Sequence, residues 1–331
     1  MSHSPESALK QSSHWVNSVP NGLDARAKKP RSVRPRERSA TSPPEPPLDA
    51  FALYELAATN PGPLAAFVRA VYGPSGNSKK DLGSRAKRTS IAGPRTLRED
   101  FSGTGALARE WTASDPNARA ILVDSDPAPL EWARALLTPD QIRRTQLIQA
   151  DVMTCQARCD ALVASNFPIG YFHERAALLS YLRASRERLR RGGILVCDLY
   201  GGPDAWTPGV MKQSLKLGKR RVVYSWHQQS CDPLSGRVHC AMHFEVGPEP
   251  NAGRNSSKRR ARTLRNAFTY DWRLWSIPEA QDAMLEAGFR AVDIYDELGG
   301  AIDQDGNLHV RPVRAGEPLG SAFVVYLVGR K

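Results

Sequence analysis

The sequence predicts an α/β protein with a parallel sheet covered by helices on both faces, and three observations support this prediction. Apolar, strand-like runs alternate with helical runs between residues 96 and 202. A glycine-rich turn separates the first of these strands from the first helix. Beyond residue 202 the alternation stops and two strand-like segments flank a short turn, which is typical of an antiparallel hairpin.

The parallel strands are predicted from short apolar runs, because strands that are buried on both faces are apolar throughout. The predicted strands are 96–101, 118–124, 145–151, 159–167 and 192–200. The predicted helices between them are 104–113, 127–137 and 173–191. Leucines recur on one stripe of the last helix, which indicates a face that packs on the sheet.

An antiparallel extension and a final pair of strands follow. The strands predicted for the extension are 220–230, 236–246 and 265–275, and the last two strands are predicted at 290–297 and 321–329. Ser276 and Glu279 form a capping box with a proline in the first turn, which predicts the start of a helix. Gly288 is placed to end that helix.

The residues before the first strand divide into three parts. Residues 1–48 carry eight prolines and few periodic apolar residues, so we expect a disordered, basic, proline-rich tail. Residues 51–73 predict two short helices that are broken at Asn60-Pro61. Residues 74–95 are rich in Gly, Ser, Lys and Arg and predict a loop.

The net charge of +12 is concentrated in three segments, 1–48, 78–98 and 251–265, which together carry +16. The rest of the chain therefore carries −4 and is mildly acidic. We interpret the basic segments as a solvated tail and solvated loops. A rim of basic residues that follows phosphates around a site is the alternative.

The five cysteines include no CxxC pair, which argues against a disulfide framework and against a zinc ribbon. The sequence has no apolar run at its N-terminus that could be a signal peptide, and no stretch of about 18 consecutive apolar residues. We therefore expect a cytoplasmic protein without a membrane span.

The glycine turn is the first motif that carries chemistry. Gly103, Gly105 and Ala108 fit the spacing G-x-G-x-x-G/A, and Asp124 ends the next strand 19 residues after Gly105. Glycines at such a turn let the backbone approach a ligand, and an acid on the neighbouring strand can bind a ribose. On spacing alone, a dinucleotide and another nucleotide-like cofactor both fit.

From about residue 96 to the C-terminus, the chain resembles the class I S-adenosylmethionine-dependent methyltransferases. The stretches that carry the resemblance are "TLREDFSGTGALA", "ILVDSDPAPLEWAR", "LIQADVM", "RLRRGGILVCDLYGG" and "FTYDWRLWSIPEAQDAMLEAGF". A bacterial subgroup of that family carries a similar EDF-x-GT turn and an upstream element like "LYEL" at 53–56. The resemblance implies a Rossmann-like sheet of seven strands, mostly parallel, whose last strand is antiparallel.

The resemblance also suggests how the chain is organised, with residues 49–331 forming one methyltransferase domain after the tail. Its expected parts are N-terminal helices and a basic loop at 49–95, a cofactor-binding core at 96–202, an antiparallel extension at 203–275 with a basic loop at 248–265, and a C-terminal helix and strands at 276–331.

The resemblance implies S-adenosyl-L-methionine as the cofactor. The residues that it assigns to the cofactor are Glu99, Asp100, Gly103, Thr104, Gly105, Asp124, Asp151, Val152 and Asn166. Asp124 would accept both ribose hydroxyls, a charge-assisted use of a carboxylate, and Asp151 would accept from the adenine amino group. Glu99 or Asp100 would bind the ammonium group, with Glu99 favoured. Phe101 departs from the family pattern because it replaces the first glycine of the motif.

Residues for the methyl acceptor are less clearly marked. Candidates for a catalytic role are Tyr171, His227 and His239, and candidates for the substrate pocket are Tyr54, Phe172 and Tyr200. No metal is expected, because His239 and His243 on one strand would lie about 13 Å apart and cannot bind one ion together.

The sequence therefore predicts a methyltransferase that acts on a small molecule, since the folded part of the chain is not basic. One alternative is an RNA or protein methyltransferase that uses the basic loops 79–98 and 254–265. A second alternative is a cofactor-binding or interaction protein without catalytic activity. A third is an NAD-dependent oxidoreductase, against which the lack of a Lys/His catalytic motif in the second half counts.

Overall fold

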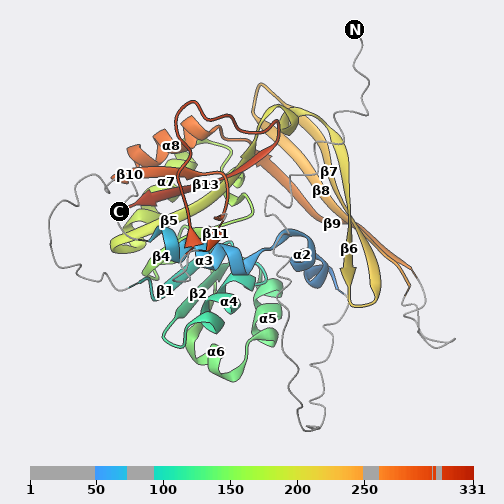
Figure 1. Cartoon of the computed structure of the whole chain (residues 1–331), viewed down its shortest axis with the longest axis horizontal. Helices are drawn as coiled ribbons and strands as arrows, with labels where there is room; N and C mark the ends of the chain where they lie inside the picture. The colour runs from blue at the N-terminus through green and yellow to red at the C-terminus, as the bar shows by residue number, and fades with distance from the viewer. Residues whose placement is uncertain (1–48, 73–92, 249–260, 300, 303–307) are drawn as a thin grey trace, which may run out of the picture.

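The computed structural model describes residues 49–72, 93–248, 261–299, 301–302 and 308–331 (Figure 1). The expected tail at 1–48 lies outside the described residues, as do 79–92 and 254–260 of the two basic loops. No helix in the described ranges is both long and apolar enough to cross a bilayer.

A seven-stranded sheet with the order β10-β13-β5-β4-β1-β2-β3 forms the centre of the molecule. Its strands are β1 (Thr96–Asp100), β2 (Arg119–Asp124), β3 (Thr145–Gln149), β4 (Cys159–Ala164), β5 (Leu189–Gly201), β10 (Ala291–Tyr295) and β13 (Phe323–Arg330). The first five strands pair in parallel, and β13 runs antiparallel between β5 and β10. The predicted fold class, with an antiparallel last strand, is confirmed.

Helices cover both faces of this sheet, as its apolar strands require. They are α3 (Pro61–Val71), α4 (Ala106–Ser114), α5 (Pro127–Leu136), α6 (Pro139–Arg144), α7 (Arg175–Arg188) and α8 (Ile277–Glu286). In β4, Leu162 and Ala164 pack in the core beneath α7 and α8, whereas Ala161 and Val163 pack beneath α3 and α4. The alternation of side chains along a strand thus supplies two separate cores.

A second, antiparallel sheet lies to one side of the first (Figure 1). Its four strands, in the order β6-β7-β8-β9, are β6 (Gly209–Leu217), β7 (Arg220–Asp232), β8 (Arg237–Val246) and β9 (Arg262–Arg273). The sequence predicted three of them and missed β6, whose "GVMKQSLKL" is half polar and lies at the sheet edge. Helix α2 (Ala50–Ala58) packs Leu53 and Ala57 against the inner face of this sheet, on Tyr224 and Phe244.

Short elements complete the described chain. They are the 3-10 helices η3 (Pro168–Tyr171) and η4 (Pro203–Trp206) and the strand pair β11 (Ala301–Ile302) and β12 (Leu308–His309). Helix α6 was not predicted, although Thr138 and Gln141 form a capping box around its proline start. At six residues, α6 is too short to show a helical period in its sequence.

Candidate functional site

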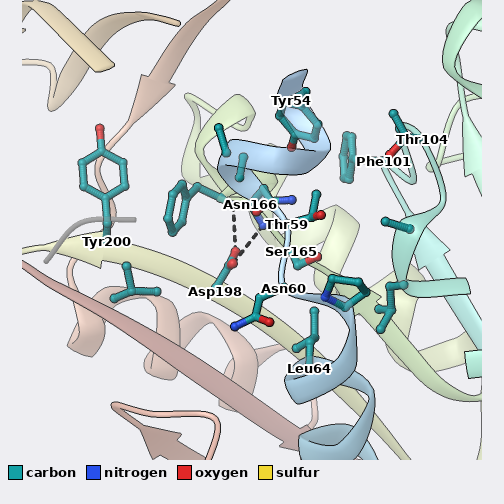
Figure 2. Close-up of a pocket in the computed structure, with 18 of the residues that line it drawn as sticks. Tyr54, Thr59, Asn60, Leu64, Phe101, Thr104, Ser165, Asn166, Asp198 and Tyr200 are labelled. Carbon is teal, nitrogen blue, oxygen red and sulfur yellow. Dashed lines mark hydrogen bonds between the residues drawn. The ribbon is translucent and has the colours of Figure 1, made fainter. Parts of the chain in front are cut away.

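A cavity of about 410 Å³ lies where the carboxyl ends of β1, β4 and β5 meet α2, α3 and the second sheet (Figure 2). The strand order reverses beside β1, since β2 and β3 lie on one side of it and β4 and β5 on the other. Ligands of open α/β sheets bind at this kind of reversal, and the volume is typical of sites for small molecules.

The glycine turn after β1 forms one wall of the cavity. Gly103 and Gly105 have φ values of +49° and +64°, which few residues other than glycine adopt. A Cβ atom on Gly103 would meet no protein atom within 4 Å, whereas one on Gly105 would lie 2.7 Å from Leu122 Cδ1. Gly103 and Thr104 line the cavity. Gly103 therefore leaves room for a ligand, and Gly105 allows α4 to pack closely on β2.

Asp124, at the end of β2, is joined to the same turn. Its Oδ2 accepts the backbone N–H of Gly103 at 2.8 Å, and its Oδ1 accepts the N–H of Asp126 at 3.0 Å. Asp124 is not among the residues that line the cavity, but each carboxylate oxygen has a second lone pair for a further donor. The structure thus brings Asp124 and Gly103, two of the residues assigned to the cofactor, into direct contact.

Glu99 and Asp100, the two candidates for the ammonium group, point to opposite sides of β1. Glu99 lines the cavity, and its Oε2 is buried without a hydrogen-bond partner. Burial raises the pKa of Glu99 to about 8. Asp100 is fully buried on the other side, where it pairs with Arg98 at 2.6 Å and accepts the hydroxyl of Tyr181 at 3.2 Å. Asp100 therefore has a structural role, and Glu99 remains the candidate.

Asp151 and Val152 follow β3 and do not line the cavity. Asp151 is exposed and accepts the backbone N–H of Met153 at 2.7 Å, while Val152 is buried. The loop that holds them is fixed from below by the buried guanidinium of Arg98, which donates to the carbonyl of Cys155 at 2.9 Å. The predicted adenine residues thus lie on an ordered loop beside the end of β2.

Asn166 lines the cavity at the end of β4, in a strained turn. Asn166 and Phe167 have φ values of 69° and 66°, and left-handed residues of this kind cost about 1–3 kcal/mol each. The carboxylate of Asp198 compensates, because it accepts the backbone N–H of Asn166 at 2.8 Å and that of Phe167 at 2.7 Å (Figure 2). Burial raises the pKa of Asp198 to about 6, against these two hydrogen bonds.

The opposite side of the cavity is aromatic. Five aromatic residues from β5, β7 and β9, which we call the aromatic wall, line it: Tyr200, Tyr224, Trp226, Tyr270 and Trp272. The ring centroids of Tyr270 and Trp272 are 4.3 Å apart, and those of Trp226 and Trp272 are 5.9 Å apart. Met242 of β8 also lines the cavity beside them. The rings of Tyr200, Trp226, Tyr270 and Trp272 contact one another and form one continuous surface.

Tyr54 of α2 completes the enclosure. Its side chain lines the cavity and contacts the ring of Phe268 with centroids 5.1 Å apart. Burial raises the pKa of Tyr54, and the nearby Asp198 and Glu99 add to the effect. Tyr54 and Tyr200, the two tyrosines among the candidates for a substrate pocket, thus both line the cavity.

Two other candidates, Tyr171 and Phe172, do not line the cavity. Phe172 stacks on Tyr181 within the core, with ring centroids 4.8 Å apart. Tyr171 is 45% exposed and packs its ring against Phe101 and Trp272. The sequence placed both aromatic residues near the site but could not show which way η3 turns them.

The histidine candidates lie on the outer face of the second sheet. Alternation along β7 turns Trp226 toward the cavity and His227 away from it, where His227 lies against His243. On β8, His239 Nδ1 is 3.6 Å from Asp271 Oδ1. Neither His227 nor His239 lines the cavity, so neither is placed to act as a base on a ligand bound there. Within the described ranges, no group of three or more His, Cys, Asp or Glu is arranged to hold a metal ion.

Sequence reasoning did not assign several residues of the cavity to the site. They are Phe101, Asp198, Tyr224, Trp226, Met242, Tyr270, Asp296, Glu297 and Tyr326. The sequence did mark Asp198, because an acidic residue inside an apolar strand needs a hydrogen-bond donor or a cation as its partner. Phe101, with a φ of 54°, stands where the methyltransferase motif that the sequence resembles has its first glycine. The residues of the second sheet had no signal beyond their aromatic character.

No family model matches the chain, and no curated protein matches it in sequence. Solved structures are similar to it in fold. The sugar N-methyltransferase KedS8 from Streptoalloteichus sp. is 19% identical, with a TM-score of 0.56 over 92% of this chain and 99% of that chain. The CcbJ methyltransferase from Streptomyces caelestis is 16% identical, with a TM-score of 0.51 over 81% of this chain and 94% of that chain.

DesVI from Streptomyces venezuelae is also similar, at 18% identity and a TM-score of 0.51 over 71% of this chain and 83% of that chain. At these identities the likeness concerns the arrangement of helices and strands alone. The chain therefore has the Rossmann-like fold that these proteins share.

Proposed function

We propose that this protein is an S-adenosyl-L-methionine-dependent methyltransferase that acts on a small molecule. One observation carries the proposal: the turn at Gly103 presents bare backbone to a cavity into which Glu99 directs a buried carboxylate oxygen without a partner. A buried, unpaired carboxylate oxygen is unfavourable unless a ligand supplies a donor.

The residues present fit this cofactor. Glu99 would accept from the ammonium group of the methionine moiety, whose positive charge favours the ionised carboxylate and so lowers the raised pKa. Gly103 would lie against the methionine and ribose, and Asp124 would accept the ribose hydroxyls. Asp151 would accept from the adenine amino group. When bound, the cofactor supplies an electrophilic methyl group.

The protein's own contribution is to position the acceptor and to exclude water. The break between α2 and α3 places Thr59 and Asn60 at the cavity, which Tyr54 of α2 lines as well (Figure 2). The cavity volume supports a small acceptor, and the fold shared with the sugar N-methyltransferase KedS8 is compatible with one.

Calorimetry with S-adenosylhomocysteine and with NAD⁺ tests the cofactor. We expect the first to bind and the second not to bind, and the reverse result would favour an oxidoreductase. Transfer of a labelled methyl group into a cell extract, divided into RNA, protein and small molecules, then tests the acceptor. Label in the small molecules supports the proposal, whereas label in RNA or protein favours the alternative that uses the basic loops. Tight binding without transfer to any fraction would indicate a cofactor-binding protein without catalytic activity.

A further inference from the structure

The acidic and basic side chains that line the cavity are all acids, which can carry only negative charge. They are Glu99, Asp198, Asp296 and Glu297, and no Lys, Arg or His of the described ranges lines it. Arg109 lies near Glu99 and lowers its pKa, but Arg109 is turned away to pair with Glu55 at 2.7 Å. The space inside is therefore suited to a ligand that carries positive charge.

The proposed cofactor would not pair with all of these acidic side chains. It brings an ammonium group and a sulfonium group but also a carboxylate, and Glu99 and Asp124 at the glycine turn are assigned to it. Asp198 lies beyond that turn, on the side of the cavity that Tyr200 also lines, while Thr104 lies on the opposite side (Figure 2). Two of the four lone-pair sites of the Asp198 carboxylate are used by backbone N–H groups, which leaves capacity for another donor.

Phe167 contacts both Asp198 and the aromatic wall. The backbone N–H of Phe167 donates to Asp198, and its ring lies 5.0 Å from that of Tyr200 and 5.8 Å from that of Trp272. A carboxylate beside Trp and Tyr rings is the combination that binds ammonium groups, since ring faces attract a cation and bind alkyl groups at the same time.

We propose that the methyl acceptor is an amine, bound as its ammonium ion between the aromatic wall and Asp198. This proposal rests on the proposed function and names its substrate class. The bound ammonium first releases one proton to water. The nitrogen lone pair then forms the new N–C bond, the S–C bond breaks with its electron pair remaining on sulfur, and the methylated amine leaves as the ammonium ion.

A matched pair of probes tests the charge requirement without measuring activity. Choline and 3,3-dimethyl-1-butanol have nearly the same shape and differ in the charge of one atom. We expect choline to bind about tenfold more tightly when each is titrated by calorimetry in the presence of saturating S-adenosylhomocysteine. Equal affinities, or no binding of choline, would overturn the amine proposal. Because binding of S-adenosylhomocysteine is measured separately, that result leaves the proposed function standing.

Variants of the aromatic wall test whether its rings cause the preference for choline over the neutral probe. Trp226→Leu keeps an apolar side chain but removes the ring, so we expect choline to lose most of its advantage over the neutral probe. Trp206→Leu is the control, because Trp206 is 40% exposed and lies outside the cavity. Tyr270→Leu repeats the test if Trp226→Leu does not fold. An unchanged ratio of affinities in a folded variant of the wall would contradict the proposal.

Asp198→Asn tests the carboxylate in the same way. We expect it to weaken choline binding about fivefold or more with little change for the neutral probe, because a charged partner is lost. Glu245→Gln is the control, since Glu245 is exposed on β8 and does not line the cavity. Equal losses for both probes would mean that Asp198 only holds the turn at Asn166.

The acceptor itself can be tested by blocking amines. Aqueous acetylation of the small-molecule fraction of an extract converts primary and secondary amines into amides and leaves alcohols free. We expect the acetylated fraction to accept about tenfold less labelled methyl than a mock-treated fraction, because most of the acceptor amines are blocked. Full acceptor activity after acetylation would overturn the proposal for primary and secondary amines, which are the amines that acetylation blocks.

Discussion

The two walls of the cavity differ in the groups that they present to a ligand, which are mainly backbone in one wall and aromatic side chains in the other. The wall at the glycine turn consists of bare backbone at Gly103 and one buried carboxylate, that of Glu99. The aromatic wall consists of side chains on an antiparallel sheet. An atom added at Gly103 would occupy the space that the turn leaves for a ligand, whereas side chains of the aromatic wall can be exchanged while the strands stay in place. We therefore expect the turn to be intolerant of substitution and the aromatic wall to set acceptor preference.

Gly103→Val should have the largest effect and abolish binding of S-adenosylhomocysteine in calorimetry. The valine side chain would fill the open space before the turn, and a β-branched residue at a φ of +49° costs about 1–2 kcal/mol in addition. Gly192→Val is a matched control, because Gly192 has a φ of +76° with equally open surroundings but lies outside the cavity. It should lose stability and keep its affinity. Binding to Gly103→Val at wild-type strength would show that the cofactor does not touch this turn.

Asp100→Asn should have the second-largest effect, which is a loss of stability. It leaves the fully buried Arg98 without a counter-charge, which typically costs about 3–5 kcal/mol in the free energy of unfolding. Denaturant titration measures this loss. Glu99→Gln, one residue away, should instead weaken cofactor binding and leave the fold intact. If both variants lost stability equally, Glu99 would be a structural residue as well.

Asp124→Ala should weaken binding of S-adenosylhomocysteine by about 1.5–3 kcal/mol, the contribution of hydrogen bonds to a charged group. Asp126→Ala is the control, because Asp126 caps α5 through the N–H of Ala128 and should affect stability by about 1 kcal/mol without changing the affinity. Unchanged affinity in Asp124→Ala would contradict the ribose assignment.

The smallest effect is a dependence of stability on pH. The pKa of Glu99 is raised from 4.5 to about 8, so between these values the folded protein binds a proton that the unfolded chain has released. Raising the pH within this window therefore destabilises the fold, by at most about 1.4 kcal/mol per pH unit, and lowering the pH restores the stability. Thermal unfolding of the wild type and of Glu99→Gln, from about pH 7 to about pH 8, measures the difference between their slopes. Identical slopes would mean that Glu99 is ionised in the free protein.

Much of the glycine-turn wall could be predicted because its residues are close in sequence. Gly103 follows β1 directly, and Asp124 ends the next strand, where parallel pairing must bring the two together. The same reasoning could not choose between Glu99 and Asp100, since it fixes that neighbours on a strand point apart but not which one faces the ligand. Phe101 was seen as a departure from the glycine pattern, but not as part of the cavity.

The aromatic wall could not be predicted in this way. Trp226 and Trp272 are 46 residues apart and meet only because β7, β8 and β9 pair in one register. A shift of one residue in that pairing would turn His227 toward the cavity instead of Trp226. The histidine candidates failed for this reason, since the sequence showed the residue types but not the face.

The sequence by itself determined the seven strands of the central sheet, the helices that cover it apart from α6, and the position of the glycine turn. These features follow from local patterns: apolar runs, caps and the conformational freedom of glycine at positive φ. The tertiary structure alone decided that Asp198 holds the turn at Asn166 and that the second sheet faces the cavity with rings rather than imidazoles. Such contacts join residues far apart in the chain, and only the folded arrangement fixes which of them meet.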